Sequence, residues 1–77
     1  MTRVVLVGKP DCHLCEQAEL VVSRVCGDLG VEWETQSILD DPELADEFWE
    51  SIPVVLIDGE EFCHWRVDPE ALKQELA

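Results

Sequence analysis

The sequence predicts an α/β domain whose elements follow in the order β-α-β-α-β-β-α. Three observations lead to this prediction. A β-branched run is followed by apolar residues at helical spacing. Two Asp-Pro-Glu stretches are each suited to begin a helix. An Asp-Gly step between two short apolar stretches is typical of a tight hairpin. Together they predict one domain over residues 1–77, with a mixed four-stranded sheet flanked by three helices.

The first β-α-β unit occupies the first half of the chain. Arg3 to Val7 is a continuous run of the kind found in strands buried on both faces. From His13 onward, apolar residues recur at spacings of three and four, which predicts a helix, and Gly27 and Gly30 are expected to mark its end. Residues 31–38 alternate well enough for a second strand. A right-handed crossover makes these two strands parallel neighbours.

The second half repeats one helix-start pattern. In Asp41-Pro42-Glu43 and in Asp68-Pro69-Glu70, Asp caps a helix, Pro fits its first position and Glu suits the positive end of the helix dipole. Between these helices, residues 54–57 and 61–66 are expected to form strands. The turn at Asp58-Gly59 makes those two strands an antiparallel hairpin.

The net charge of the chain indicates which classes of partner are not expected. There are 18 acidic and 5 basic residues, with a net charge of −13, so we expect neither nucleic acid nor an anionic membrane surface as a partner. The longest apolar run is too short to span a bilayer, and the N-terminus lacks the pattern of a signal peptide. We therefore expect a cytoplasmic protein, and a monomer is the default expectation. Structural disulfides are rare in the cytoplasm, which favours a catalytic or metal-binding role for a C-x-x-C pair.

Cys12 and Cys15 stand where the first strand gives way to the first helix. Residues three apart on a helix are neighbours, at a separation that suits a disulfide. Free N–H groups and the helix dipole favour a thiolate at Cys12, and Lys9 and a protonated His13 add positive charge. Asp11 either opposes this effect or caps the helix. Cys15 lies one turn inside the helix, and we expect it to be the resolving thiol that attacks a mixed disulfide on Cys12.

Other roles for the pair stay open. Zinc and iron–sulfur sites also use C-x-x-C, and Cys63 or His64 could complete such a site. The chain would then be a non-enzymatic metal or iron–sulfur carrier. A third possibility is an interaction module that keeps the fold and has lost the chemistry. Cys26 is expected to be a small buried hydrophobe, and Trp65 either packs or lines a substrate groove.

Ser51-Ile52-Pro53 is the second stretch of interest. Proline directly before a buried strand is unusual, because it cannot donate to the sheet. A cis Ile52–Pro53 bond would form a turn that presents the backbone of Ile52 to an extended substrate. Alternatively, Pro53 merely ends the preceding helix. With the cysteine pair upstream, we favour the cis bond.

Together, the segments Lys9 to Cys15 and Ser51 to Val54 resemble the active-site and proline segments of glutaredoxins, which have the thioredoxin fold. The resemblance spans nearly the whole chain, and within it the sequence is most similar to a short bacterial glutaredoxin-like family with Cys-His-Leu-Cys. It implies a thiol–disulfide oxidoreductase with Cys12 as nucleophile and Cys15 as resolving thiol. No bound cofactor is implied. The substrate-binding candidates are Lys9, for a glutathione carboxylate, with His13, Ile52 and Pro53.

The chain departs from glutaredoxins after the fourth predicted strand. Those proteins have a Gly-Gly step there, followed by an acidic residue that helps to hold glutathione. Residues 62–68 of this chain read FCHWRVD, so bulky side chains replace the glycines and Asp68 matches the acidic position. The reductant therefore stays open between glutathione, another small thiol and a flavoprotein. The expected substrate is a protein or small-molecule disulfide.

Overall fold

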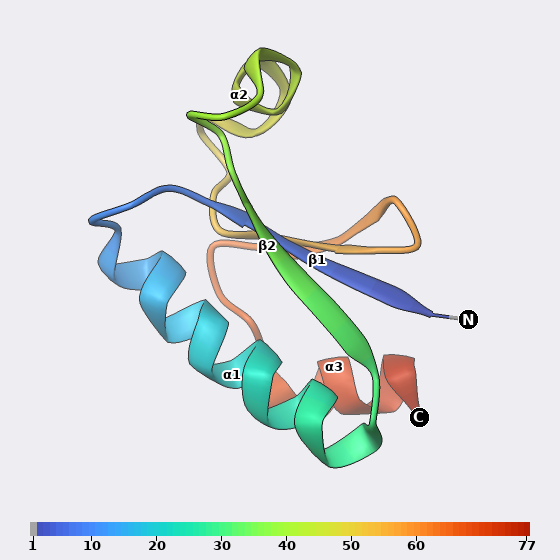
Figure 1. Ribbon diagram of the computed structural model, residues 1–77. Coiled ribbons are helices and arrows are strands. Elements are labelled where there is room, and N and C mark those ends of the chain that lie inside the picture. The colour runs from blue at the N-terminus through green and yellow to red at the C-terminus, as the bar shows by residue number, and fades with distance from the viewer. Residues whose placement is uncertain (1) are drawn as a thin grey trace.

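The computed structural model describes residues 2–77 and confirms the predicted order of elements (Figure 1). The sheet order is β2-β1-β3-β4, with β1 and β2 parallel and the other neighbouring pairs antiparallel. This is the predicted mixed sheet. The predicted domain begins at Met1, which lies outside the described residues. The element bounds are β1 Arg3–Gly8, α1 His13–Leu29, β2 Glu32–Ser37, α2 Pro42–Phe48, β3 Val54–Ile57, β4 Glu60–His64 and α3 Pro69–Leu76.

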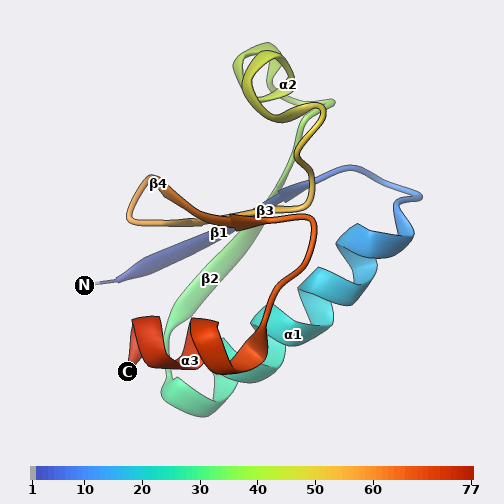
Figure 2. The ribbon, with the colours of Figure 1, turned by 180° about the vertical axis from the view of Figure 1, so that it is seen from behind.

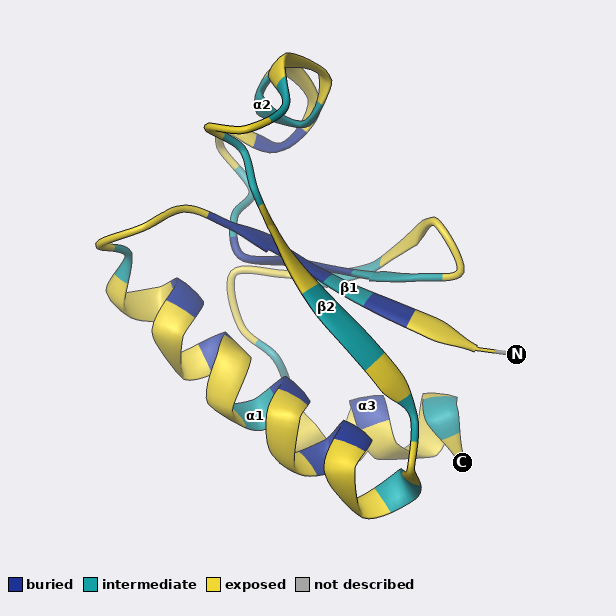
Figure 3. Ribbon diagram, viewed as in Figure 1, coloured by how far each residue is buried: buried dark blue, intermediate teal, exposed yellow. Residues whose placement is uncertain are grey.

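The helices divide unequally between the two faces of the sheet. The long α1 and the short α3 lie side by side on one face, and α2 stands near one end on the other side (Figures 1 and 2). The buried residues of α1 face the sheet, and its outer side is exposed (Figure 3). The larger apolar cluster lies under α1 and α3, and a smaller one forms around Val7, Phe48 and Val54. Over the described residues, the helices are too short or too polar to cross a bilayer.

Capping residues set the ends of the helices largely as predicted. The carboxylates of Asp41 and Asp68 each accept a hydrogen bond from the backbone N–H two residues later, at 2.9 and 3.0 Å. Gly30 ends α1 in the left-handed conformation, with φ of 69°. The expectation that Gly27 also marks the end is wrong, because Gly27 lies within the helix. A helical glycine costs only about 1 kcal/mol relative to alanine, and the burial of neighbouring residues outweighs this cost.

The fourth strand is shorter than predicted. It ends at His64 rather than Arg66, because Trp65 adopts a φ of +65° that cannot continue a strand. The β3–β4 ladder is also irregular: Val55 pairs with Cys63, but the next residue of β3 pairs with Glu61. Phe62 is therefore the extra residue of a bulge.

Candidate active site

Three loops meet at one end of the sheet. They are residues 9–12 after β1, residues 49–53 before β3 and residues 65–68 after β4 (Figures 1 and 2). Val7 of β1 pairs with Val54 of β3, so the next residues outward, Gly8 and Pro53, share this end. The side chain of Cys15 packs against Gly8. The fold thus brings the cysteine pair and the proline segment to one place, although 38 positions separate Cys15 from Pro53 in the printed sequence.

Cys12 is the N-cap residue of α1. Its backbone is extended, with φ of −108° and ψ of 112°, and its Sγ accepts a hydrogen bond from the backbone N–H of Cys15 at 3.3 Å. A sulfur thus takes the place of the usual Ser or Asp oxygen. Two roles were considered for Asp11, and the structure contradicts the role of helix cap. Asp11 lies before the cap, in a left-handed conformation with φ of 59°. An N–H aimed at Sγ favours negative charge on that atom.

Cys15 lies in a contrasting environment. Its side chain is buried, with 8% of the residue exposed, whereas Cys12 is half-buried. Burial raises the pKa of the Cys15 thiol to about 11, and a hydrogen bond with Cys12 adds to the rise. A backbone hydrogen bond from Lys9 and the charge of that residue act in the opposite direction. At neutral pH, Cys15 is therefore a protonated thiol beside the more accessible sulfur of Cys12.

Gly8 is a site residue that the sequence analysis did not identify. A Cβ at this position would lie 3.0 Å from Sγ and 3.2 Å from Cβ of Cys15. Contacts this short are tighter than nine in ten real Cβ contacts, so a larger residue requires the side chain of Cys15 to shift by a few tenths of an ångström. Nothing local marks this glycine, because the contact joins β1 to α1 across the layers. Only the packed structure reveals it.

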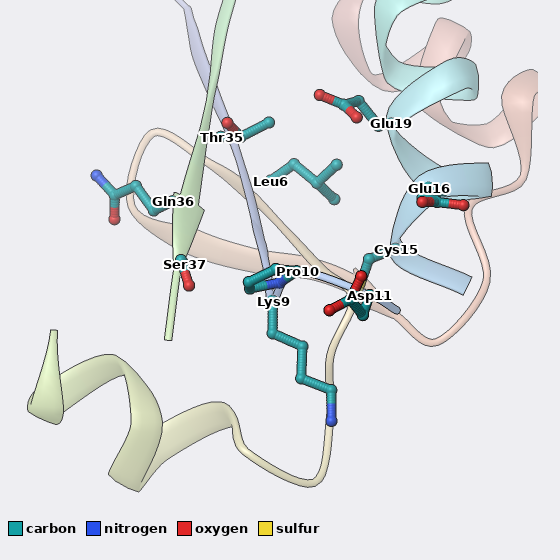
Figure 4. Close-up of a pocket in the computed structure, with 11 residues that line it drawn as sticks. Leu6, Lys9, Pro10, Asp11, Cys15, Glu16, Glu19, Thr35, Gln36 and Ser37 are labelled. Atoms are coloured by element: carbon teal, nitrogen blue, oxygen red, sulfur yellow. The ribbon is translucent and has the colours of Figure 1, made fainter. Parts of the chain in front are cut away.

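A cavity of about 310 Å³ opens on the β2 side of Cys15 (Figure 4). Thr35, Gln36 and Ser37 line it from β2, and Glu16 and Glu19 line it from α1. We call it the β2-side cavity. The ammonium group of Lys9 extends away from the two glutamates (Figure 4). Polar and acidic groups thus surround this approach to the buried thiol.

The remaining predicted substrate-binding residues lie around the same end. His13 is the exposed first residue of α1, and its Nε2 lies 3.1 Å from Nε2 of Gln17, within hydrogen-bond distance. The Ile52–Pro53 peptide bond is cis, as predicted, and Pro53 is buried. The N–H of Ile52 donates to the carbonyl of Phe48 at 3.2 Å. A substrate strand would have to replace that bond to pair with the N–H, whereas binding to the carbonyl oxygen of Ile52 requires no such exchange.

The other two cysteines, Cys26 on α1 and Cys63 on β4, lie apart from the pair in the sequence. Cys26 is fully buried in the larger core, as predicted, and burial raises its pKa. Cys63 is half-buried on β4, and burial, followed by the charge of Glu61, raises its pKa. All four cysteines are free thiols. Within residues 2–77, no three His, Cys, Asp or Glu side chains converge as metal ligands.

Similar sequences cover almost the whole chain. Uncharacterized proteins of Mycobacterium bovis and Mycobacterium tuberculosis are 29% identical over 80 residues, covering 97% of this chain and 82% of each relative.

Solved structures share the fold over most of this chain. The X-ray structure of protein XcR50 from X. campestris is 27% identical, with a TM-score of 0.77 and coverage of 95% of this chain and 93% of the other. Protein Ne2328 of Nitrosomonas europaea shares the fold with a TM-score of 0.84, at 23% identity and with coverage of 99% and 92%. Mitochondrial thioredoxin 3 of Saccharomyces cerevisiae has a TM-score of 0.72, at 15% identity and with coverage of 97% and 76%. The fold is therefore thioredoxin-like.

The match to a family is more specific than the likeness of fold. Residues 3–77 match the family described as Glutaredoxin-like domain (DUF836). This match includes both cysteines of the pair and the cis proline, and it confirms the family resemblance predicted from Lys9 to Cys15 and Ser51 to Val54. The chain belongs to the glutaredoxin-like domain family.

Proposed function

We propose that the protein is a thiol–disulfide oxidoreductase that reduces disulfides through Cys12 and Cys15. The observation that carries this proposal is the asymmetry of the pair. Cys12 Sγ is half-exposed and accepts the N–H of Cys15 at 3.3 Å, whereas Cys15 is buried with a pKa of about 11. A nucleophile needs access and a stabilised thiolate, and a resolving thiol needs protection until the mixed disulfide forms.

The reaction proceeds in two exchanges. The Cys12 thiolate attacks one sulfur of the substrate disulfide; a Cys12–substrate S–S bond forms, the substrate S–S bond breaks and the first substrate thiolate leaves. Cys15 then loses its proton and attacks Cys12 Sγ, which forms the Cys12–Cys15 disulfide and releases the second substrate thiolate. Both leaving thiolates take up protons. The substrate gains two electrons, and an external thiol or a flavoprotein reductant restores the dithiol.

The surrounding residues have supporting roles in this proposal. Pro53, at the end of the sheet shared with Gly8, shapes the substrate groove, and the carbonyl oxygen of Ile52 accepts a hydrogen bond from an extended substrate. Lys9 binds a substrate or glutathione carboxylate, and His13 contributes at the exposed start of α1. The reaction needs no bound cofactor. We propose that the protein works as a monomer in the cytoplasm.

The test is a redox titration of the purified protein across dithiol buffers, followed by alkylation, intact-mass measurement and peptide mapping. We expect two thiols to be lost reversibly together, mapping to Cys12 and Cys15. Cys12→Ser should abolish both this loss and the reduction of a disulfide substrate. The matched control, Cys63→Ser, removes a half-buried thiol outside the pair and should retain both.

Three results would overturn the proposal. Full activity in Cys12→Ser would show that another group performs the chemistry. A pair that never closes in any buffer would leave an interaction module, and a pair protected by a metal that chelators remove would instead indicate the carrier function.

A further inference from the structure

Trp65 has an unusual backbone conformation. Its φ of +65° lies in the left-handed region, which bulky side chains rarely adopt. Among the described non-glycine residues, only Asp11 and Asp58 share a positive φ, and aspartate tolerates that region better because its short side chain can bond locally. Strain of this kind persists only where surrounding contacts impose it.

Two hydrogen bonds hold Trp65 against residues 49–53, the loop that contains the cis proline and is called the cis-proline loop below. Its backbone N–H donates to the carbonyl of Pro53 at 2.8 Å, and its indole Nε1–H donates to the carbonyl of Glu50 at 2.9 Å. The ring also meets His64 edge-on, with centroids 4.8 Å apart. Nevertheless, 55% of Trp65 is exposed. The protein therefore holds a large apolar surface in a fixed orientation and leaves it uncovered.

Trp65 borders a groove that runs along α1. We call it the Trp65 groove; its volume is about 160 Å³, and it lies between residues 65–67 and the first three turns of the helix. Leu14, the residue between His13 and Cys15, forms its end and is itself 48% exposed. Ala18 and Val21 continue the wall. The groove thus begins two residues from Cys12, and hydrogen bonds tie its other wall to the cis-proline loop.

The charges of the groove differ from those of the chain. No carboxylate lines it among the described residues, and Arg66 is at its edge, although the net charge of the chain is −13. The β2-side cavity, by contrast, is lined by Asp11, Glu16 and Glu19. An uncharged apolar side chain can enter the Trp65 groove without meeting a carboxylate, and an acidic neighbour of that side chain would be attracted to Arg66.

We infer that Trp65 is a specificity-determining residue, and that the Trp65 groove selects protein disulfides in which a large apolar side chain flanks the attacked cysteine. This inference rests on the proposed function. The side chain of a leucine or phenylalanine packs between Leu14 and Trp65 while Cys12 forms the mixed disulfide. Glutathione carries no apolar side chain beside its cysteine, so its disulfide gains nothing from this contact.

The experiment compares two peptides of equal length and charge, each carrying one cysteine bridged to the same small thiol. One has leucine beside the cysteine and the other has serine. The reduced protein should react with the leucine peptide about tenfold faster or more, as expected for burial of one apolar side chain. Trp65→Ala should bring the two rates within about twofold of each other, by slowing the leucine peptide alone.

Two further variants complete this test, one at the opposite wall of the groove and one outside it. Leu14→Ser removes the opposite wall at an exposed position, and should also reduce the preference if Trp65→Ala fails to fold. Leu20→Ser is the matched control, because Leu20 is an exposed apolar residue of the same helix, 72% exposed, and lies outside the groove; it should keep the full preference.

The possible failures are distinguishable. Equal rates for the two peptides with the unmodified protein would overturn the inference and leave the oxidoreductase intact. If Trp65→Ala slows the reaction with both peptides equally, so that the preference is unchanged, Trp65 has a purely structural role. If neither peptide is reduced and the Cys12–Cys15 pair never closes, the proposed function itself fails.

Discussion

Cys12 and Cys15 are three residues apart and lie in opposite environments. Cys12 caps α1, is half-exposed and accepts an N–H from the helix start. Cys15 is buried against Gly8 of β1, and its pKa is raised to about 11. Helical spacing brings the two sulfurs together, but it does not make them different. The difference comes from the sheet, which covers one residue of the pair and leaves the other accessible.

Removal of Cys15 tests the comparison most severely. If the buried thiol resolves mixed disulfides, Cys15→Ser should stop the intramolecular step completely and trap substrate on Cys12. Intact-mass measurement after mixing the reduced variant with a disulfide substrate, with no added thiol, should show a stable adduct on Cys12. The unmodified protein is the control and should show only a transient adduct. No adduct in the variant would contradict the assigned order of attack.

The response of Cys15 to pH gives the next largest effect. Because its pKa is raised, the thiol stays protonated as pH rises through neutrality, and its reactive thiolate increases about tenfold per pH unit up to about pH 11. Alkylation rates of Cys15, followed by peptide mapping from pH 7 to 11, should climb over this whole range. In denaturant, burial is lost, so the same thiol should titrate near its ordinary value of about 8.5. A folded-state midpoint below pH 9 would contradict the protection of Cys15.

A methyl group at Gly8 tests the contact that covers Cys15. Gly8→Ala places a Cβ 3.0 Å from the cysteine sulfur, so we expect a loss of about 1–3 kcal/mol in the free energy of unfolding. Closure of the Cys12–Cys15 disulfide should also slow by roughly tenfold, because the sulfur is displaced. Urea denaturation and the rate of closure measure the two effects.

Gly27→Ala is the matched control for this substitution. Nothing lies within 4 Å of a Cβ at Gly27, which is within α1. This variant should stabilise the protein by about 0.5–1 kcal/mol and leave closure unchanged. Equal effects of the two substitutions would show that the contact between Gly8 and Cys15 does not control stability or disulfide closure.

Local sequence patterns predicted the elements well where local chemistry sets their ends. Asp41 and Asp68 cap their helices through side-chain hydrogen bonds to nearby residues, and Gly30 supplies a left-handed turn. The prediction was wrong where a distant contact decides. Trp65 ends β4 early because its hydrogen bonds reach Pro53 and Glu50, which a reading of residues 61–66 alone cannot reveal.

The sequence by itself determined the order of elements, the spacing that makes Cys12 and Cys15 neighbours and the resemblance to glutaredoxins. These follow from periodicity, capping and motif, all of which act over a few residues. Only the tertiary structure decided that Gly8 packs against Cys15 and that Trp65 is exposed beside a groove that includes Leu14. These features depend on how close segments approach after the layers pack, and steric exclusion and burial at that distance are not encoded in any local pattern.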